Sequence, residues 1–244
     1  KYRSIVRSVQ SVPPSTPTPI VYLMIGTLPA VAIRDIQILQ LAGQLAMCDR
    51  ELQSVSDIIE YNLAGENIDF NGWSGVARRT EAIYGLMDPL ELFQNPWESH
   101  RWSKYVTKEV TKYWTDLLIN NAETYPSLDS VDLSQLSLTS PHPIWAAAAT
   151  NPVSVMKATV VTWLLLNVYK TGERLYKMKK SSSAACILCS SPLDDQIHFT
   201  LECGELAEIR TQYFDKFSKS CPNINNYLED KKLLLIILLD PFSY

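Results

Sequence analysis

The chain has 244 residues, of which 46% are hydrophobic, 20% charged and 10% aromatic, a composition typical of folded proteins. Its formal net charge of −4 excludes a generally basic nucleic-acid-binding protein, so nucleic-acid contacts would need local basic patches. With 8 glycines against 14 prolines, the sequence favours helices interrupted by proline over strands joined by glycine turns. We therefore expect an all-α fold of helical bundle-like segments.

The sequence carries no export or membrane signal. It opens at Lys1 without a methionine, as a fragment or processed product does, and no basic-then-apolar leader follows. Its 5 cysteines are an odd number, which argues against a secreted disulfide framework. The longest apolar stretch, Val153 to Tyr169, contains Lys157 and is shorter than the about 20 residues that cross a bilayer. We expect an intracellular protein, nuclear or cytoplasmic, with no membrane partner.

The N-terminal part alternates basic, stiff and apolar segments. Tyr2 to Gln10 is mildly basic through Arg3 and Arg7, and the prolines between residues 13 and 19 form a hinge too stiff for a helix. The stretch from Val21 to Pro29 then leads into an apolar helix expected from Ala30 to Ala46. Apolar residues cover more than one face of this helix, which predicts burial on several sides.

An acidic segment follows from Asp49 to Glu91. Nine acidic residues oppose three arginines there, which gives a local charge of −6 and predicts a solvated acidic helical surface. Gly72 and Gly75 are expected to form a turn, because they lack the lysine of a phosphate-binding loop. Cys48, just before this segment, is expected to be a small core residue.

The second half begins after Asn95-Pro96-Trp97 with an amphipathic helix expected from Ser99 to Asn120. One side of this helix carries aromatic and branched apolar residues at helical spacing. The other side carries cations at steps of three and four, which predicts a basic ridge. The members of this ridge are Arg101, Lys104, Lys108 and Lys112.

A polar connection, Pro126 to Ser140, leads to an apolar helix expected from Val153 to Tyr169. A basic run follows it, in which five cations oppose one acidic residue, Glu173, for a local charge of +4. Tyr169 and Tyr176 are interleaved with these cations. Beyond the run we expect a short amphipathic helix, about residues 205–217, and a last apolar helix, about residues 227–239. The cations of the basic run are Lys170, Arg174, Lys177, Lys179 and Lys180.

Four residues near the C-terminus have the spacing of a metal site, Cys-x2-Cys-x8-His-x4-Cys. Three thiolates and one imidazole suit Zn²⁺, and four protein ligands leave no open position, so we predict a structural zinc ion. Phe199 and Leu201 are expected to pack this segment against its neighbours. Disulfides, an iron–sulfur cluster, or four unrelated buried residues are the alternatives. The predicted ligands are Cys186, Cys189, His198 and Cys203.

No other residues form a convincing active site. Asp194 and Asp195 lie between the ligand pairs, where loop solvation is the expected role. His100 and His142 have no cysteine or serine nearby in a recognisable catalytic arrangement, and Cys221 is expected to be a spare thiol. We therefore expect no enzymatic activity, no catalytic residue and no small-molecule substrate.

The order of segments resembles the C-terminal region of LINE-type, non-LTR retrotransposon reverse transcriptases of invertebrates. The resemblance implies a thumb end from Lys1 to about Met47, then a linker, then a zinc knuckle that helps hold template RNA or target DNA. The polymerase's aspartate-bearing motif and any endonuclease signature are missing, so the polymerase would lie upstream in the same protein. The matching pieces are Pro14-Ser15-Thr16-Pro17, Tyr22 to Pro29, Asn95-Pro96-Trp97, Lys112-Tyr113-Trp114, His142 to Trp145, the cysteine–histidine cluster, Leu206 to Arg210 and Leu239-Asp240-Pro241.

These expectations combine into one functional hypothesis and one alternative. The hypothesis is a non-catalytic nucleic-acid-binding region that contacts RNA or DNA phosphates through the basic run, with Lys104, Lys108 and Lys112 as a second ridge. The alternative is a zinc-stapled helical scaffold that binds protein. We expect residues 1–95 to be a thumb-like and linker segment, 96–180 a linker with the ridge, 181–204 the knuckle and 205–244 the C-terminal helices.

Overall fold

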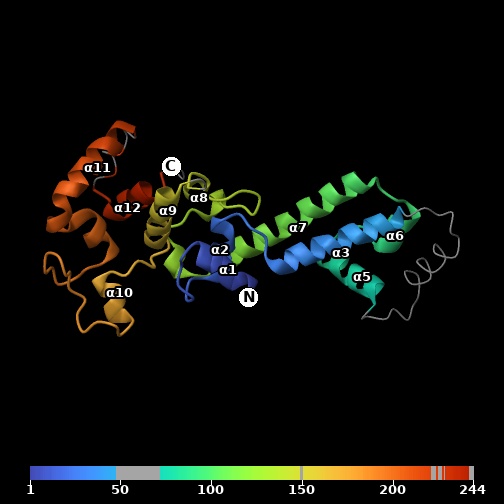
Figure 1. The fold of residues 1–244 in the computed structure, drawn as a ribbon, viewed down its shortest axis with the longest axis horizontal. Helices are drawn as coiled ribbons and strands as arrows, with labels where there is room; N and C mark the ends of the chain where they lie inside the picture. The colour runs from blue at the N-terminus through green and yellow to red at the C-terminus, as the bar shows by residue number, and fades with distance from the viewer. Residues whose placement is uncertain (48–71, 149–150, 221–223, 225–226, 228, 242–244) are drawn as a thin grey trace. The chain divides into compact units, whose positions relative to one another are not determined.

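The computed structural model describes residues 1–47, 72–148, 151–220, 224, 227 and 229–241 (Figure 1). Helices make up the regular structure of this described part, which contains no strand, and this confirms the all-α prediction. The chain divides into two compact units, Gly26–Leu118 and Lys1–Ile25 with Ile119–Tyr244. The predicted boundaries after residues 95, 180 and 204 stay predictions. None of the described helices has the length and apolar character needed to cross a membrane.

The unit Gly26–Leu118 is built on α3, which has the predicted bounds Ala30–Ala46. The helices α5 and α6 pack against α3, and most of α7 completes the unit. A single stripe of α3 is buried, whereas Ile33 and Leu41 are 38% and 49% exposed, so the predicted burial on several sides is wrong. The other helices span Trp73–Tyr84 (α5), Pro89–Gln94 (α6) and Ser99–Ala122 (α7).

The buried stripe of α3 is made largely of small residues, which let α7 approach closely. Trp102 of α7 is 2% exposed and its indole N–H donates to the Leu39 carbonyl at 2.8 Å. A Cβ atom added to Gly43 would lie 2.1 Å from Cδ1 of Trp102, so the ring occupies the space that a side chain would fill. Glycine at this position therefore sets the spacing between the two helices.

A buried carboxylate links α3, α5 and α7. Asp35 is 2% exposed and accepts a hydrogen bond of 2.6 Å from the Tyr84 hydroxyl, which itself accepts one of 2.9 Å from the Trp114 indole. Burial and the hydrogen bond to Asp35 raise the pKa of Tyr84, so this hydroxyl remains a donor. The network satisfies polar groups that would otherwise be costly to bury.

The segment before α5 corrects one expectation. Gly72 is the residue before α5 and Gly75 lies within the helix, so the predicted turn over these two glycines is wrong. The helix ends at Gly85, whose φ of 61° is the left-handed conformation that glycine adopts without strain. Residues 49–71 of the predicted acidic surface, together with Cys48, lie outside the described residues.

The second unit contains the two termini and the metal-site region. Its helix α2 covers part of the proline-rich segment for which we predicted no helix. Pro19 lies in the first turn of α2, where its missing N–H leaves no intrahelical hydrogen bond unmade, so proline does not exclude a helix here. The helices of the unit are α1 (Tyr2–Val9), α2 (Thr18–Met24), α8 (Pro143–Ala146), α9 (Pro152–Leu165), α10 (Gly172–Lys177), α11 (Ala207–Ser220) and α12 (Lys231–Leu239).

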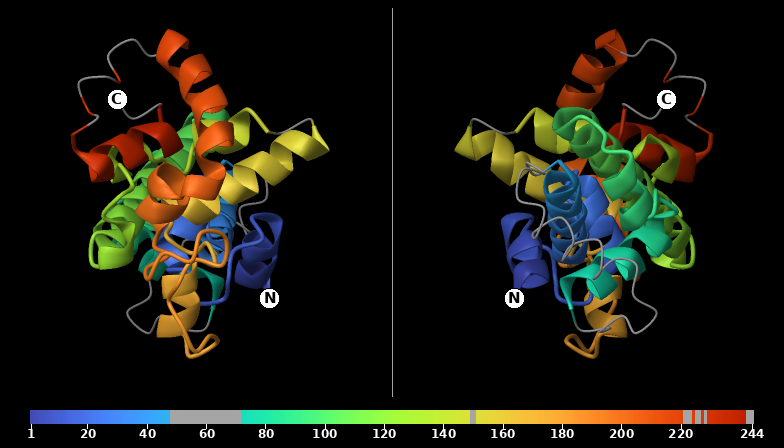
Figure 2. Two further views of the ribbon diagram at one scale, coloured as in Figure 1. Left: turned by 90° about the vertical axis from the view of Figure 1, so that its left-hand side faces the viewer. Right: turned by 90° about the vertical axis from the view of Figure 1, so that its right-hand side faces the viewer.

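The helices α9 and α12 lie side by side in Figures 1 and 2 and contact each other. The helix α9 ends earlier than the predicted Tyr169 because Asn167 takes a φ of 50° and breaks the helical path. The helix α12 starts later than predicted, since the Asp230 carboxylate caps it by accepting from the N–H groups of Lys232 and Leu233. As expected, α12 ends just before Asp240.

His142 and Asp240 form a buried pair that joins the start of α8 to the end of α12. The N–H of Ile144 donates to Nδ1 of His142, which leaves Nε2 to carry the proton toward Asp240 Oδ2 at 3.2 Å. The His142 backbone N–H also donates to the Met24 carbonyl at 2.9 Å. His142 is therefore a structural residue.

Replacing His142 by alanine is expected to lower the free energy of unfolding by about 2 kcal/mol, because the buried Asp240 carboxylate loses a hydrogen-bond donor. Urea denaturation measures this loss. The control is Asp132→Ala, which removes an exposed cap on the Ser134 N–H and should cost less. Equal losses in the two variants would contradict the structural role of the buried pair.

Candidate metal centre

The four predicted ligands lie close together and can hold a metal ion. Their ligand atoms are all within 4.8 Å of one another. The Sγ atoms of Cys186 and Cys203 are 3.9 Å apart, and Cys189 Sγ is 3.3 Å from His198 Nε2. A tetrahedral zinc ion with Zn–S bonds of about 2.3 Å places two sulfurs about 3.8 Å apart. The two sulfurs of a disulfide would be about 2.05 Å apart. The three cysteines that the structure describes are free thiols.

The Cys-x2-Cys segment is a tight turn that aims both thiols at one point. The N–H of Ser190 donates to the Cys186 carbonyl at 3.0 Å, and the N–H of Cys186 donates to the Ser191 carbonyl at 2.8 Å. Ser190 closes this turn in the left-handed backbone conformation, with a φ of 61°. A hydrogen bond from the backbone of Ser191 lowers the pKa of the Cys189 thiol, which favours the thiolate that binds metal.

The His-x4-Cys segment is a π-helical turn, η3 (His198–Glu202). In an α-helix, residues five apart point about 140° away from each other. Here the N–H of Cys203 donates to the His198 carbonyl at 2.7 Å, so five residues make one wider turn. This turn brings the imidazole of His198 and the thiol of Cys203 to the same side. Burial raises the pKa of the Cys203 thiol, which is 0% exposed, and a bound cation would offset that effect.

Two side chains between the last two ligands pack the site against the unit, as predicted. The ring of Phe199 lies 5.0 Å from that of Tyr169, centroid to centroid, next to the end of α9. Leu201 packs against a buried cluster that includes Ile224, Leu234 and Ile237. Arg210 of α11 adds a hydrogen bond of 2.9 Å to the Cys203 carbonyl. The site is therefore held from both sides by residues that are not ligands.

Asp194 and Asp195 are structural residues, so the prediction of loop solvation is wrong. Asp194 is 7% exposed, and its carboxylate accepts a hydrogen bond of 2.6 Å from the N–H of Gly172, at the start of α10. Its carbonyl accepts from the Glu173 N–H at 3.0 Å, and its own N–H donates to the Ala184 carbonyl at 2.8 Å. The Asp195 carboxylate accepts from the His198 N–H at 2.7 Å. A carboxylate near a helix N-terminus is stabilised there.

The cations of the basic run differ in how far they are already engaged. Lys177 pairs with Glu173 at 2.7 Å, and the Arg174 guanidinium donates to the Asn167 carbonyl. Burial lowers the pKa of Arg174. Lys170, Lys179 and Lys180 are exposed, and their ammonium groups have no ion pair or hydrogen bond within the described part of the chain. These three lysines are therefore the cations of the run that remain open to a partner.

The predicted basic ridge is an exposed row on α7, in the unit Gly26–Leu118. Its arginine, Arg101, lies 4.7 Å above the ring of Trp97, and Lys108 approaches Glu109 at 3.9 Å. Lys104 and Lys112 have no ion pair among the described residues. The ridge is solvent-facing, as the sequence predicts.

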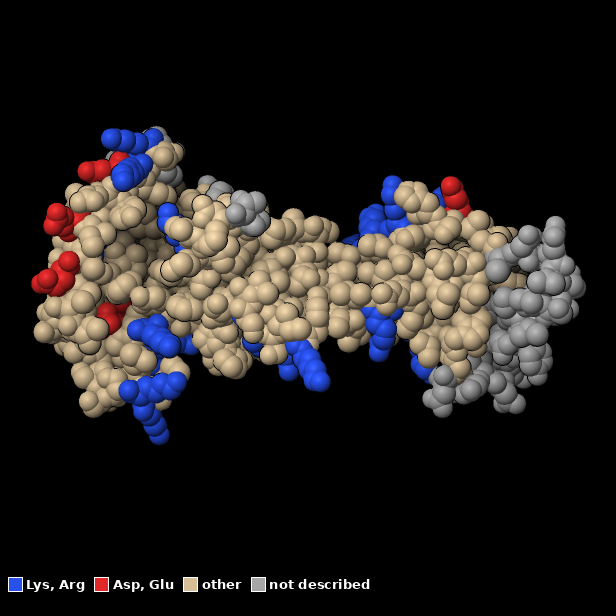
Figure 3. Space-filling view, in the orientation of Figure 1, with Lys and Arg blue, Asp and Glu red and all other residues tan. Residues whose placement is uncertain are grey.

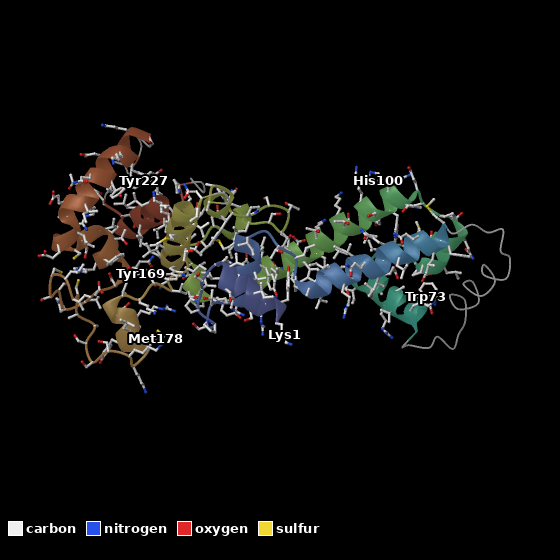
Figure 4. All side chains as sticks on the ribbon, in the orientation of Figure 1. Lys1, Trp73, His100, Tyr169, Met178 and Tyr227 are labelled. Carbon is white, nitrogen blue, oxygen red and sulfur yellow. The ribbon has the colours of Figure 1, made fainter. Side chains whose placement is uncertain are left out.

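The remaining candidates form no second centre. His100 is exposed near the start of α7 (Figure 4), and Cys221 lies outside the described residues. Among the residues that the structure places, only the cysteine–histidine cluster groups three or more side chains able to hold a metal ion.

Neither models of protein families nor comparisons with curated proteins and solved structures give a match to this chain. A function must therefore be assigned from the site itself. Two chemical features are available for this assignment. One is the compact cluster of three thiols and an imidazole, and the other is the set of open lysines before and after α10.

Proposed function

We propose that this chain is a non-catalytic nucleic-acid-binding region, stabilised by a structural zinc ion, of a LINE-type reverse transcriptase-like protein. The observation that carries the proposal is the attachment of the basic helix α10 to the metal-binding loop through Asp194. Template RNA or target DNA is the proposed partner, and a polymerase upstream in the same protein is the second. The family assignment rests on the order of segments in the sequence.

The donor set supports zinc as the metal. Thiolate and imidazole ligands are preferred by Zn²⁺, and the distances between the four ligand atoms suit a tetrahedral ion. Four protein ligands leave no position for a reacting water molecule, which supports a structural role. The imidazole of His198 binds through Nε2, the nitrogen that approaches Cys189.

The metal and the lysines are coupled through the backbone. Zinc orders the loop between Cys189 and His198, and that loop carries Asp194, which holds the Gly172 and Glu173 N–H groups at the start of α10. A side chain on Gly172 would meet the Ala185 carbonyl oxygen at 2.8 Å, so the helix start and the loop are in close contact. The bound metal thus fixes the position of α10, and with it the lysines that flank the helix, Lys170 before it and Lys179 and Lys180 after it.

The lysines around α10 supply the phosphate contacts. Figure 3 shows basic side chains gathered over this helix, and Lys170, Lys179 and Lys180 have no competing acidic partner in the described residues. Tyr176 is 53% exposed and is available to stack on an unpaired base, whereas the ring of Tyr169 is already packed on Phe199. Tyr176 is therefore the preferred stacking residue.

A protein-binding scaffold is the second candidate, and α9 is the observation that favours it. Val153, Met156 and Val160 are 58%, 70% and 41% exposed and recur at helical spacing. An apolar face of this kind buries well against another protein. Binding through it should be nearly independent of salt, whereas phosphate binding weakens steeply as salt rises.

Replacing Lys170, Lys179 and Lys180 together by glutamine is expected to weaken binding of a short single-stranded RNA uniformly across sequences. The slope of log K against log salt should fall by about 2, because roughly 0.7 counterions are released per phosphate contact. Filter binding at several salt concentrations with zinc-loaded protein measures this slope.

The matched control replaces Lys157, Lys216 and Lys219, three exposed lysines of α9 and α11, by glutamine. This control has the same net charge as the test variant, so a general charge effect would appear in both. A slope that falls equally in both variants would reject the basic run as the contact surface. No binding at low salt by the zinc-loaded chain would reject the proposed function itself.

A further inference from the structure

A small basic pocket lies beside α1, away from the metal cluster in the sequence but in the same compact unit. Its volume is about 280 Å³, and three of its lining residues are the cations Lys1, Arg3 and Arg7. Its other lining residues are Ser4, Ser8, Val12 and Pro14. None of these lining residues is acidic.

The positive charge of this pocket is not compensated locally. The first acidic residue in the sequence is Asp35, so every charged side chain among residues 1–34 is a lysine or an arginine. Lys1 and Arg3 are exposed and form no ion pair in the described part of the chain. Arg3 and Arg7 are four residues apart on one helix face, where like charges repel. A bound anion would remove this repulsion.

Arg7 is held in place before any ligand arrives. Its Nη2 donates to the Thr16 carbonyl at 2.8 Å and to the Thr18 hydroxyl at 3.0 Å. Its Nε is buried without a hydrogen-bond partner in the described residues. Burial, followed by the charge of Arg3, lowers the pKa of Arg7, as expected for a guanidinium with an excess of positive charge around it.

The helix that carries the pocket is firmly attached to its unit. Val6 is 4% exposed, and the buried Gln10 side chain donates to the Val21 carbonyl at 2.7 Å. The ring of Tyr2 lies 6.4 Å from that of Tyr22 on α2, centroid to centroid. Figure 3 shows basic side chains projecting from α1, and Figure 4 places Lys1 at this edge. Packing and a buried hydrogen bond thus hold in place the helix that carries Arg3 and Arg7.

We propose that the pocket formed by Lys1, Arg3, Ser4, Arg7 and Ser8 binds a phosphate group. Guanidinium groups form strong charge-assisted hydrogen bonds with phosphate oxygens, and lysine adds a point charge. The hydroxyl of Ser4 makes no hydrogen bond in the described part of the chain and can donate one, whereas that of Ser8 already donates to the Ser4 carbonyl at 2.9 Å. The phosphate class follows from the lining residues, and its assignment to a nucleic-acid backbone rests on the proposed function.

The test uses the zinc-loaded full chain and the double variant Lys1→Gln with Arg3→Gln, which leaves the Arg7 contacts intact. The control is Lys157→Gln with Lys219→Gln, which removes the same charge elsewhere. Titration with inorganic phosphate, followed by phosphorus NMR, should show about tenfold weaker binding for the test variant alone. For a short single-stranded RNA, the slope of log K against log salt should fall by about 0.7 in the test variant.

The two titrations distinguish a phosphate of the nucleic-acid backbone from a free phosphate compound, and they test the pocket separately from the proposed function. A change with inorganic phosphate but none with RNA assigns the pocket to a free phosphate compound. RNA binding that is equal in test and control variants, without any effect on phosphate, overturns the pocket and leaves the proposed function standing. Phosphate binding without RNA binding keeps the pocket and rejects the function, and the absence of both rejects both.

Discussion

Removing the metal from the zinc-loaded protein with a chelator is expected to unfold the segment between Ala184 and Leu206. Several apolar side chains of this segment stay exposed, with Ile187, Leu188 and Leu193 at 93%, 47% and 44%, so its own core is small. We therefore expect the zinc ion to supply most of its folding free energy, on the order of 10 kcal/mol. The variant Cys186→Ser, which removes a ligand that is 3% exposed, should act in the same direction. Hydrogen exchange at the N–H groups of Asp194 and Cys203, which donate to Ala184 and His198, measures the loss of structure.

Ser182→Ala is the control, because this exposed serine precedes the site and is not a ligand. It should keep its zinc and its exchange protection. The start of α10 should also lose protection when the metal is removed, since its Gly172 N–H donates to Asp194 in the metal-binding loop. Unchanged exchange and helicity after confirmed removal of the metal would show that the cluster has no structural role.

Replacing Gly43 by alanine is expected to destabilise the unit Gly26–Leu118 by about 3 kcal/mol. The new methyl group would lie 2.1 Å from the Trp102 ring, which would have to move and give up its hydrogen bond to Leu39. Alanine is intrinsically the better helix former by about 1 kcal/mol, so the sign of the effect distinguishes packing from propensity. Thermal and urea unfolding of the full chain measure it.

The matched control is Gly204→Ala, a glycine whose added Cβ would meet nothing within 4 Å and whose φ is not positive. Its stability should change little. Leu39→Val provides a second control, because it trims the same core without forcing the Trp102 ring to move. A Gly43→Ala variant as stable as the parent would refute the close approach of α3 and α7.

The sequence predicts best where a pattern is local. The apolar run over Ala30–Ala46 gives α3 its bounds, and the Cys-x2-Cys and His-x4-Cys spacings identify residues that come together. Local pattern fails for α2, since the prolines that break a helix interior are permitted in its first turn. It also fails for the buried side of α3, where small Ala and Gly residues are buried while the larger Ile33 and Leu41 stay exposed.

The role of Asp194 could not be read from spacing. Its partner, the Gly172 N–H, is 22 residues away, and only the folded loop brings the two together. Polar residues in loops are usually solvated, so the exception depends on tertiary contact. The pocket beside α1 had a readable signal, the lack of acidic residues between Lys1 and Asp35, but only the fold brings Val12 and Pro14 to the same pocket as the cations of α1.

The wide turn between His198 and Cys203 has a consequence for how chains with this site can diverge in length. Deleting one residue there would leave His-x3-Cys, whose two side chains share one face of an ordinary α-helix, so a standard helical turn could replace the wide one. Inserting one residue would place the two side chains about 120° apart on a helix and rotate the thiol away from the imidazole. The interval between Cys189 and His198 is different. Asp194 and Asp195 fix its second half, whereas Pro192 and Leu193 are exposed. Insertions in related chains should therefore fall at these two residues.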